Sequence, residues 1–285
     1  MQIATTVMQW YAGAARELPW RRPGVDAWAV LVSEVMLQQT PVRRVVPVYT
    51  AWLQRWPTPA ALAAAPAGEA VRTWGQLGYP RRALRLHECA VAVVQSHSGL
   101  IPAELAELLA LPGVGPYTAR AVATFAYGRP HAVVDVNVRR VVTRLVRGLD
   151  DMAPPSQDQA LVAPLVPADP AAAVRFAAGL MELGALVCTV RAPHCRQCPV
   201  AGGCAWRHAG YPPATATRAA APYAGTHRQA RGRLLAVLRA TPDPVRRADL
   251  DAAWPDPGQR ARALASLVAD RLVERRPDGD LVLPG

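Results

Sequence analysis

Four of the five cysteines of this 285-residue chain fall within a stretch of 17 residues. Their spacing is C-x6-C-x2-C-x5-C, and four thiolates so close in sequence can surround one metal centre. Zinc sites usually carry two C-x2-C pairs, whereas the corners of an iron–sulfur cubane tolerate uneven spacing. The fifth, Cys89, has apolar neighbours and is predicted to be a core thiol. The candidate ligands are Cys188, Cys195, Cys198 and Cys204.

A second group of residues could bind phosphate. Residues 111–115 read Leu-Pro-Gly-Val-Gly and lie between two predicted helices. Two glycines allow a tight hairpin whose backbone N–H groups face outward beside the next helix, which binds a phosphate without reading sequence. An ordinary helix connection is the alternative for such a turn alone. It becomes specific with Tyr117 just after it and Asp135 twenty residues further on.

A carboxyl group at position 34 could do acid–base chemistry. Glu34 lies in the apolar segment 28–37, where burial raises a carboxyl pKa and suits the group to donate a proton. Taken alone, it could equally be a capped or salt-bridged helix acid. The motifs around it decide between these interpretations.

The charge and composition narrow the class of partner. All 32 basic side chains are arginine, and the formal net charge is +11. Without lysine, neither a lysine Schiff base nor a Walker-type phosphate lysine is possible. GC-rich codon usage would explain arginine over lysine but not the surplus of charge, so we expect a polyanionic partner, most simply nucleic acid. No export signal and no bilayer-spanning segment is evident, so we expect a cytoplasmic protein.

The elements that must position these residues are predicted to be helices. Apolar residues recur three and four apart over 42–56, for example, and Pro57 and Pro59 end that helix. Val133 and Val134 could begin a strand, but nothing pairs with them, so the region up to 210 is predicted to be all helical. The other predicted helices cover 28–37, 69–76, 80–95, 103–110, 116–127, 138–146 and 170–187.

The carboxyl-terminal part has its own pattern. Residues 209–227 are rich in Ala, Thr, Pro and Gly without periodicity and are predicted to be a linker. Helices over 228–239, 248–254 and 259–274 follow, and then a hairpin over 276–283. This order is typical of a winged-helix module, whose third helix meets DNA. The alternative is a small helical domain that only packs on the main body.

Together these motifs resemble a known family. Residues 111–115 followed by Asp135 are similar to the helix-hairpin-helix, Gly/Pro-Asp family of base-excision DNA glycosylases, and the cysteine spacing resembles the iron–sulfur loop of its endonuclease III and MutY branches. The stretch 33–40, Ser-Glu-Val-Met-Leu-Gln-Gln-Thr, resembles the MutY branch, which removes adenine mispaired with 8-oxoguanine. Residues 18–21, 77–79 and 181–185 fit the same branch, and the resemblance covers about residues 7–209.

The resemblance implies a mainly α, two-lobed glycosylase fold and a [4Fe-4S] cluster on the four cysteines. It implies an iron–sulfur lobe over 1–22 and 130–208 and a six-helix lobe with the helix-hairpin-helix over 23–129. The linker, 209–227, and a small winged-helix-like domain, 228–285, complete the chain. The last domain stands where typical MutY proteins have a MutT-like domain that helps recognise 8-oxoguanine, as in shorter actinobacterial-type forms.

The resemblance also implies roles for single residues. The family's matching glutamate protonates adenine, a role that falls to Glu34, and Asp135 would stay ionised and stabilise the oxocarbenium-like sugar. Tyr117 and Asn137 would support these two groups by hydrogen bonds. The adenine pocket would contain Trp20 and Arg21. The residues that enter the duplex and contact the opposite base would be Gln38, Gln39 and Tyr79. The DNA backbone would be bound by Leu111, Gly113, Val114 and Gly115.

Two positions depart from the family pattern. Val136 stands where many relatives have a small residue, and Ala178 stands where some MutY proteins place a Glu or Gln near the base. Family members that also nick the backbone carry a lysine where this chain has Tyr117. We therefore expect base removal without efficient strand cleavage.

The expected protein is a cytoplasmic, nucleoid-associated bacterial monomer. It would act on double-stranded DNA with an A·8-oxoguanine or A·G mispair, and not at a membrane. Two alternatives stay open: a thymine mismatch glycosylase of the same fold, and a non-catalytic iron–sulfur DNA-binding regulator. Glu34 followed by Gln38, Gln39 and Thr40 favours adenine over thymine, and the intact Glu34 and Asp135 argue against a regulator.

Overall fold

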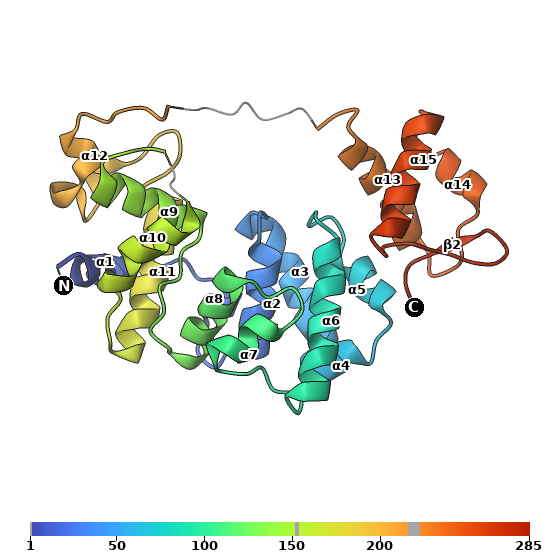
Figure 1. The fold of residues 1–285 in the computed structure, drawn as a ribbon, viewed down its shortest axis with the longest axis horizontal. Coiled ribbons are helices and arrows are strands. Elements are labelled where there is room, and N and C mark those ends of the chain that lie inside the picture. Colours follow the sequence, from blue (N-terminus) through green and yellow to red (C-terminus); the bar gives the residue numbers. More distant parts are fainter. Residues whose placement is uncertain (1, 152–153, 216–222) are drawn as a thin grey trace. The chain divides into compact units, whose positions relative to one another are not determined.

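The computed structural model describes residues 2–151, 154–215 and 223–285, which fold mainly into helices (Figure 1). No helix in these ranges is long and apolar enough to span a membrane. By their internal contacts the described residues form two compact units. The first takes those of Met1–Leu31, Ala103–Ala110 and Val114–Arg218, and the second those of Val32–Pro102, Leu111–Gly113 and Ala219–Gly285. The lobe boundaries given above stay a prediction.

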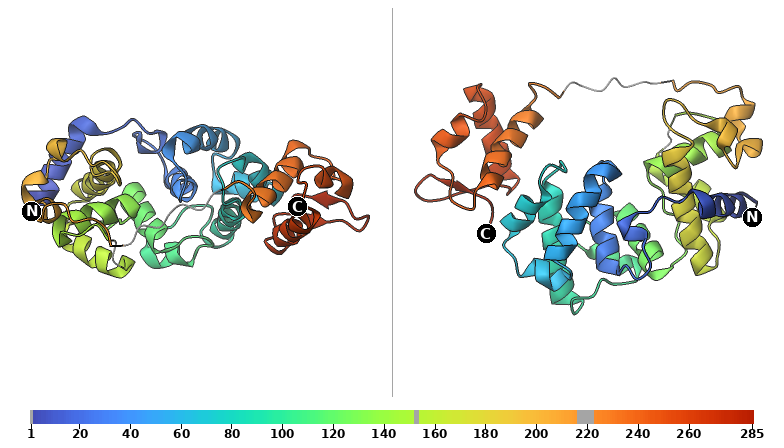
Figure 2. Two further views of the ribbon diagram at one scale, coloured as in Figure 1. Left: turned by 90° about the horizontal axis from the view of Figure 1, so that it is seen from above. Right: turned by 180° about the vertical axis from the view of Figure 1, so that it is seen from behind.

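The first unit is built around one long helix, α11 (Pro170–Leu186), on which α1 (Gln2–Ala14) and α9 (Val136–Val142) pack (Figures 1 and 2). Asp169 caps α11 by accepting a hydrogen bond from the Ala172 N–H, and Pro170 occupies its first turn. The remaining elements are η1 (Pro19–Arg21), α7 (Leu105–Ala110), α8 (Pro116–Tyr127), η2 (Thr143–Arg147), α10 (Pro155–Val162), η3 (Ala163–Leu165), η4 (Cys195–Gln197), η5 (Ala201–Gly203) and α12 (Ala205–His208).

One predicted helix of this unit is irregular. The helix expected over 138–146 starts two residues earlier as α9 and continues as a π-helical turn, η2. A π-helical turn adds one residue to the helical repeat and so re-aims the side chains after it. Gly148 then ends the segment with a φ of 68°. The irregular turn carries Arg144, which faces the cysteines described below.

Helix α2 (Ala27–Leu37) contributes residues to both units. The Asp26 carboxylate caps it by accepting a hydrogen bond from the Ala29 N–H at 2.8 Å. Every residue from Trp28 to Met36 is buried, so the helix has no solvent face. A helix that is apolar all round is stable only in a core, which explains why its apolar pattern lacks a polar stripe.

The second unit holds α3 (Val42–Arg55), α4 (Pro59–Ala63), α5 (Ala67–Trp74) and α6 (Arg81–Ser96). Three tryptophans form its centre: the Trp52 ring lies edge-on to Trp56 at 4.7 Å and to Trp74 at 5.7 Å between ring centroids. Edge-to-face pairs of this kind add about 0.5–1.5 kcal/mol each to the burial of their surface. Cys89 is buried, and burial raises the pKa of its thiol to about 12, as expected for a core residue.

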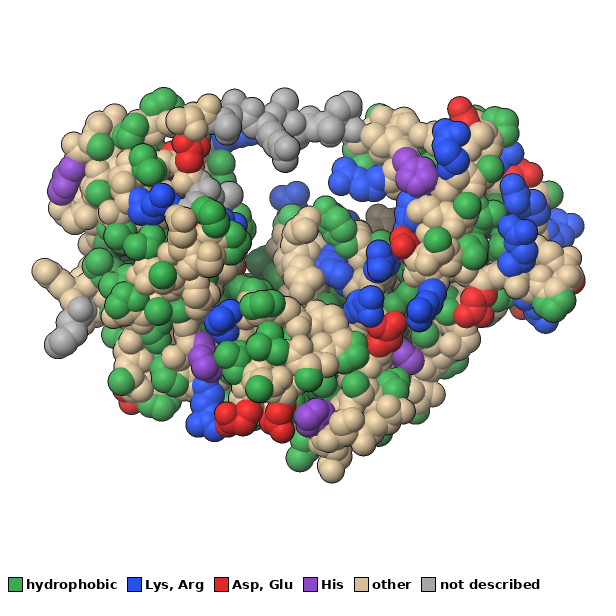
Figure 3. Space-filling model, viewed as in Figure 1, with side chains coloured by type: hydrophobic (Ala, Val, Ile, Leu, Met, Phe, Trp, Pro, Cys, Tyr) green, Lys and Arg blue, Asp and Glu red, His purple; other side chains and the backbone are tan. Residues whose placement is uncertain are grey.

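The same unit contains the carboxyl-terminal module, residues 227–285. It comprises α13 (His227–Ala240), α14 (Arg247–Asp251), α15 (Pro257–Ala269) and the antiparallel strands β1 (Glu274–Arg275) and β2 (Leu281–Val282), and Val245 forms a bridge to Leu281. Arginine side chains gather on the face of this module that Figure 3 shows at the right.

Two helix boundaries predicted in this module were wrong. The helix expected over 259–274 ends at Ala269, because Arg271 takes a φ of 55° and Glu274 already belongs to β1. The helix expected over 248–254 covers only Arg247–Asp251. The predicted linker, 209–227, lies partly outside the described residues.

Candidate active site and cysteine centre

Glu34 lies on the fully buried helix α2 and is 6% exposed. Only Ser33 and Glu34 carry polar side chains in the stretch 28–36. A buried carboxyl group whose neighbours along the helix are mainly apolar is a candidate general acid. Glu34 belongs to the second unit and Asp135 to the first, and each is described within its own unit.

Asp135 caps the amino terminus of α9, where helix dipole and free N–H groups favour a negative charge. Its Oδ1 accepts from the Val138 N–H at 2.7 Å, and its Oδ2 accepts from the Asn137 side-chain amide at 2.9 Å. Burial raises the pKa of this carboxyl, while these hydrogen bonds and the charge of Arg140 oppose that rise. Of the two residues expected to support the carboxyl groups, Asn137 thus binds Asp135.

A buried arginine extends this contact to the cysteine loop. The Arg140 guanidinium donates to the Asn137 Oδ1 at 2.9 Å, to the Gly184 carbonyl at 2.7 Å and to the Cys188 carbonyl at 2.6 Å. A Cβ on Gly184 would lie 2.7 Å from the Cβ of Asn137, so only glycine allows this approach of α11 to α9. Arg140 could not be singled out from the sequence, because nothing there distinguishes it from the 31 other arginines.

Trp20 and Arg21 lie on the short helix η1 of the first unit. Trp20 is buried, and Arg21 donates to the Glu182 carboxylate at 2.9 Å. Glu182 is fully buried and also binds Arg16 at 2.6 Å. Burial alone would raise the pKa of Glu182, but the hydrogen bonds from the two arginines lower it below its ordinary value. A charged carboxylate thus holds Arg21 in place, a role that the sequence motif at 181–185 had left open.

Tyr117 lies in the first turn of α8 and packs against the buried Ala121, Val133 and Ala177. Both glycines of the turn before it take special backbone positions. Gly113 takes a φ of 77°, and Gly115 is the N-cap of α8. Leu111 and Val114 are buried and anchor the turn, while Gly113 is exposed, as a backbone contact to a ligand would require.

Gln38, Gln39 and Tyr79 lie on two turns of the second unit that one arginine joins. Gln39 and Tyr79 have positive φ angles of 54° and 47°, which are strained for residues other than glycine. Arg82 donates to the Gln38 carbonyl at 2.6 Å, and its guanidinium lies 5.5 Å from the Tyr79 ring centroid. Tyr79 is 48% exposed despite its ring, so it is available to a partner.

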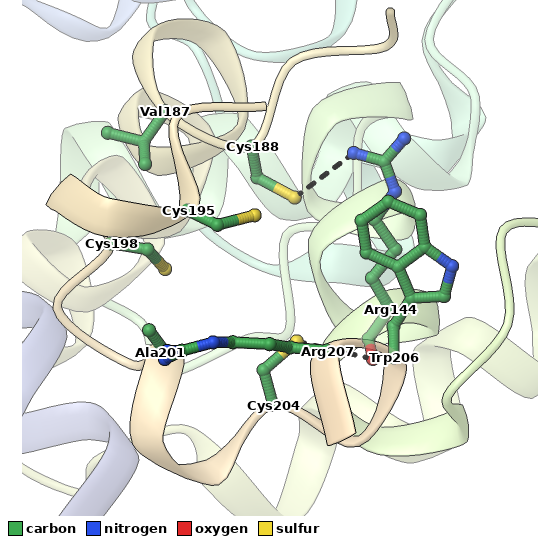
Figure 4. Close-up of a pocket in the computed structure, with 9 residues that line it drawn as sticks. All are labelled: Arg144, Val187, Cys188, Cys195, Cys198, Ala201, Cys204, Trp206 and Arg207. Atoms are coloured by element: carbon green, nitrogen blue, oxygen red, sulfur yellow. Dashed lines mark hydrogen bonds between the residues drawn. The ribbon is translucent and has the colours of Figure 1, made fainter. Parts of the chain in front are cut away.

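The four clustered cysteines surround one cavity of the first unit (Figure 4). All four carry free thiols, and their sulfur atoms point toward a shared space. Across the described residues, no three His, Cys, Asp or Glu side chains are arranged to hold a metal ion. All four thiols nevertheless line the same cavity. The ligand candidates from the sequence are thus brought together, and Val187, Ala201, Trp206 and Arg207 complete the lining.

Arg144 closes one side of this cavity. Only 2% of it is exposed, and it donates to the Cys188 Sγ at 3.5 Å and to the Thr189 carbonyl at 2.7 Å. Its guanidinium lies 4.5 Å from the Trp206 ring centroid, and it pairs with Asp150 at 2.7 Å. Burial raises the pKa of the Cys198 thiol to about 11, so binding of a metal centre must displace its proton.

Comparison with known proteins identifies the relatives of this chain. Residues 32–163 match the family model for HhH-GPD superfamily base excision DNA repair proteins. The chain is 55% identical over 280 residues to the adenine DNA glycosylase of Mycolicibacterium smegmatis, covering 98% of this chain and 95% of that protein. It is 54% identical over 285 residues to the adenine DNA glycosylase of Mycobacterium tuberculosis H37Rv, covering 99% and 93%.

Among solved structures, a thermostable thymine-DNA glycosylase is similar in fold. It superposes with a TM-score of 0.66 at 27% sequence identity and covers 73% of this chain and 96% of its own. More than a quarter of this chain lies outside the match. The much higher identity to adenine enzymes decides against the thymine alternative.

Proposed function

Because this chain belongs to the adenine DNA glycosylase family within the HhH-GPD superfamily of base excision DNA repair proteins, we propose that it excises adenine paired with 8-oxoguanine or guanine and leaves the strand uncut. It is a DNA N-glycosylase of base excision repair, and DNA is its substrate. Beyond the family's reaction, we propose which base lies opposite the adenine, that the strand stays uncut, and what each site residue does.

The burial of Glu34 is the observation on which the proposed mechanism rests. We infer that its carboxyl group protonates the adenine ring, so that the bond from the base to C1′ of the sugar breaks toward a neutral base. Asp135 faces the positive charge that then develops on the sugar. Its two oxygens both accept hydrogen bonds, which favours the ionised form that this task needs. Water supplies the oxygen that completes hydrolysis.

The remaining predicted residues bind and position the DNA. Trp20 and Arg21, the latter fixed by Glu182, would line the pocket for the flipped adenine. Gln38, Gln39 and Tyr79 would enter the duplex and contact the opposite base. The backbone N–H groups around Gly113 and Gly115 would bind a phosphate. Tyr117 and Asn137 would support Glu34 and Asp135 by hydrogen bonds.

The cysteine centre fits a [4Fe-4S] cluster bound by Cys188, Cys195, Cys198 and Cys204. Four sulfurs that point into one space suit a group whose four iron atoms each take one thiolate. When bound, the cluster would fix the loop from Cys188 to Cys204 by covalent bonds. The exposed Arg191 and Arg196 of this loop, and the exposed Arg207 just after it, would then meet DNA phosphates.

One assay tests both parts of the proposal. Purified protein is incubated in single turnover with duplexes that carry A·8-oxoguanine, A·G or T·G, and each product is analysed with and without alkali. We expect adenine release from the first two duplexes and strand breaks only after alkali, since no lysine can attack the sugar. Release of thymine but not adenine would reject the substrate, and abundant breaks without alkali would reject the proposed monofunctional reaction.

A further inference from the structure

The turn that carries Tyr79 is fixed by side-chain hydrogen bonds to its backbone carbonyl groups. We name residues 75–79, between α5 and α6, the probe turn. Each of its first four carbonyl groups accepts a hydrogen bond from a side chain, and the donors come from separate parts of the second unit. The carbonyl of Gly75 is bound by Arg239, that of Gln76 by Arg44, that of Leu77 by Thr40 Oγ1 at 3.1 Å, and that of Gly78 by Trp74 Nε1 and Arg82, both at 3.0 Å.

The probe turn needs these bonds because its backbone is strained. Gly75, Gly78 and Tyr79 have positive φ angles of 54°, 84° and 47°. Glycine adopts such angles readily, but tyrosine adopts them only with backbone strain. A residue in this conformation persists only where its surroundings determine it. Here the side chains that bind the carbonyl groups hold the turn in this conformation.

One of these donors comes from the carboxyl-terminal module. Arg239 lies in the last turn of α13 and donates to the carbonyls of Val71, at 2.9 Å, and of Gly75. It thus binds the carboxyl end of α5, where the helix dipole favours a cation, at the residue that begins the probe turn. Burial lowers the pKa of Arg239 to about 10, which still leaves it charged at neutral pH.

The module is docked here by bonds in both directions. Arg72 of α5 donates to the carbonyls of Leu238, Arg239 and Thr241, at the end of α13. Each helix therefore has its terminal carbonyls bound by an arginine of the other. The Gly68 N–H also donates to the Pro284 carbonyl at 2.6 Å. Hydrogen bonds to charged groups are stronger than those between neutral groups, so these contacts hold the module at a defined place on α5.

We propose that the carboxyl-terminal module acts in recognition of the opposite base by fixing the probe turn through Arg239, and not by reading that base itself. The proposal rests on the proposed function, in which Tyr79 enters the duplex beside the opposite base. Arg239 is a positioning residue: it touches no DNA, and its effect passes through the backbone of Gly75. The module thereby contributes to discrimination between opposite bases, although it is not a second base-binding domain.

The test compares full-length variants in single-turnover adenine release from A·8-oxoguanine and A·G duplexes. The measured quantity is the preference, the ratio of the two rates at subsaturating enzyme. Arg239→Ala is expected to lower this preference about tenfold, the effect of losing roughly one charged hydrogen bond. Simple loss of folded protein would lower both rates alike and leave the ratio unchanged. Arg233→Ala, which removes an exposed arginine of the same helix, should keep the wild-type preference.

A double-mutant cycle with Tyr79→Ala identifies the route of the effect. If Arg239 acts through the probe turn, Tyr79→Ala lowers the preference and Arg239→Ala adds little to it. Additive losses would mean that the module contacts DNA independently, which overturns the proposal. Arg72→Ala is a milder second variant, since it loosens the docking but keeps Arg239, and its expected change has the same direction.

The outcomes separate this inference from the proposed function. A wild-type protein that releases no adenine, or a Tyr79→Ala variant with normal preference, would reject the proposed function at that residue and this inference with it. A lowered preference in Tyr79→Ala with normal preference in Arg239→Ala and Arg72→Ala would overturn this inference alone.

Discussion

Both oxygens of Asp135 accept hydrogen bonds, and the donors decide when this carboxyl is ionised. Burial raises its pKa, so its proton is lost at a higher pH than that of a solvated aspartate. Each bond to the carboxylate opposes that effect. Since the proposed reaction needs the ionised form, adenine release must fall as the pH drops through the raised pKa.

This gives a prediction for the acid side of the pH profile. Asn137→Ala removes the amide that donates to the Asp135 Oδ2, so the carboxylate loses stabilisation and its pKa rises further. The acid limb of single-turnover adenine release should move to higher pH. Val136→Ala alters the exposed neighbouring side chain, which the carboxylate does not bind, and should keep the wild-type limb. An unshifted limb in Asn137→Ala would show that the amide does not set the ionisation of Asp135.

The chemical groups of the site were easier to predict than the residues that hold them. Glu34, Asp135 and the four cysteines stand out because their types and spacing are rare. Arg140, Arg82 and Arg239 do not, because their partners are mostly backbone carbonyls far along the chain. A carbonyl acceptor leaves no trace in the sequence. Their roles follow only from the folded structure.

Among the elements, the helix with the clearest apolar periodicity was predicted well: it was expected over 42–56 and covers Val42–Arg55. The helix over 116–127 has the predicted bounds, and the apolar helix that carries Glu34 begins one residue earlier than predicted. Helices α1, α4, α10 and α12 were not predicted. α1 contains the β-branched Thr5, Thr6 and Val7, which have modest helix propensity, and its packing on α11 stabilises it instead.

The contact of α11 with α9 positions Asp135, and a single methyl group tests it. In Gly184→Ala the added Cβ would lie 2.7 Å from the Asn137 Cβ and 2.8 Å from its carbonyl oxygen, so α9 must shift. Overpacking of this kind costs about 1–3 kcal/mol, and we expect a matching loss in unfolding free energy and in adenine release. Urea unfolding and single-turnover kinetics measure the two.

The control for that change is Gly13→Ala. A Cβ at this helical position meets nothing within 4 Å, so the substitution should be neutral or slightly stabilising. Because alanine favours helix over glycine at both sites, a loss confined to Gly184→Ala must come from the contact with Asn137. Equal behaviour of the two variants would contradict the account of this contact.

For the whole molecule, the fold and the reaction could be predicted from joint motifs, and the comparisons confirmed the family. The formal net charge of +11, in a chain whose basic side chains are all arginine, agrees with a substrate bound through its phosphates. How the carboxyl-terminal module docks could not be predicted, because its contacts with α5 are reciprocal bonds from arginines to helix-end carbonyls. Such an interface has no characteristic residue composition or residue spacing that would be visible in the sequence.

The central claim is that the buried carboxyl of Glu34 is the acid that releases adenine. Single-turnover release from an A·8-oxoguanine duplex, measured for the wild type and for Glu34→Gln together with the affinity of each for the same duplex, tests it most directly. The amide has nearly the same shape but cannot give up a proton in the same way, so we expect release to fall by about 10²–10⁴-fold with affinity little changed. Release at the wild-type rate by Glu34→Gln would contradict the account.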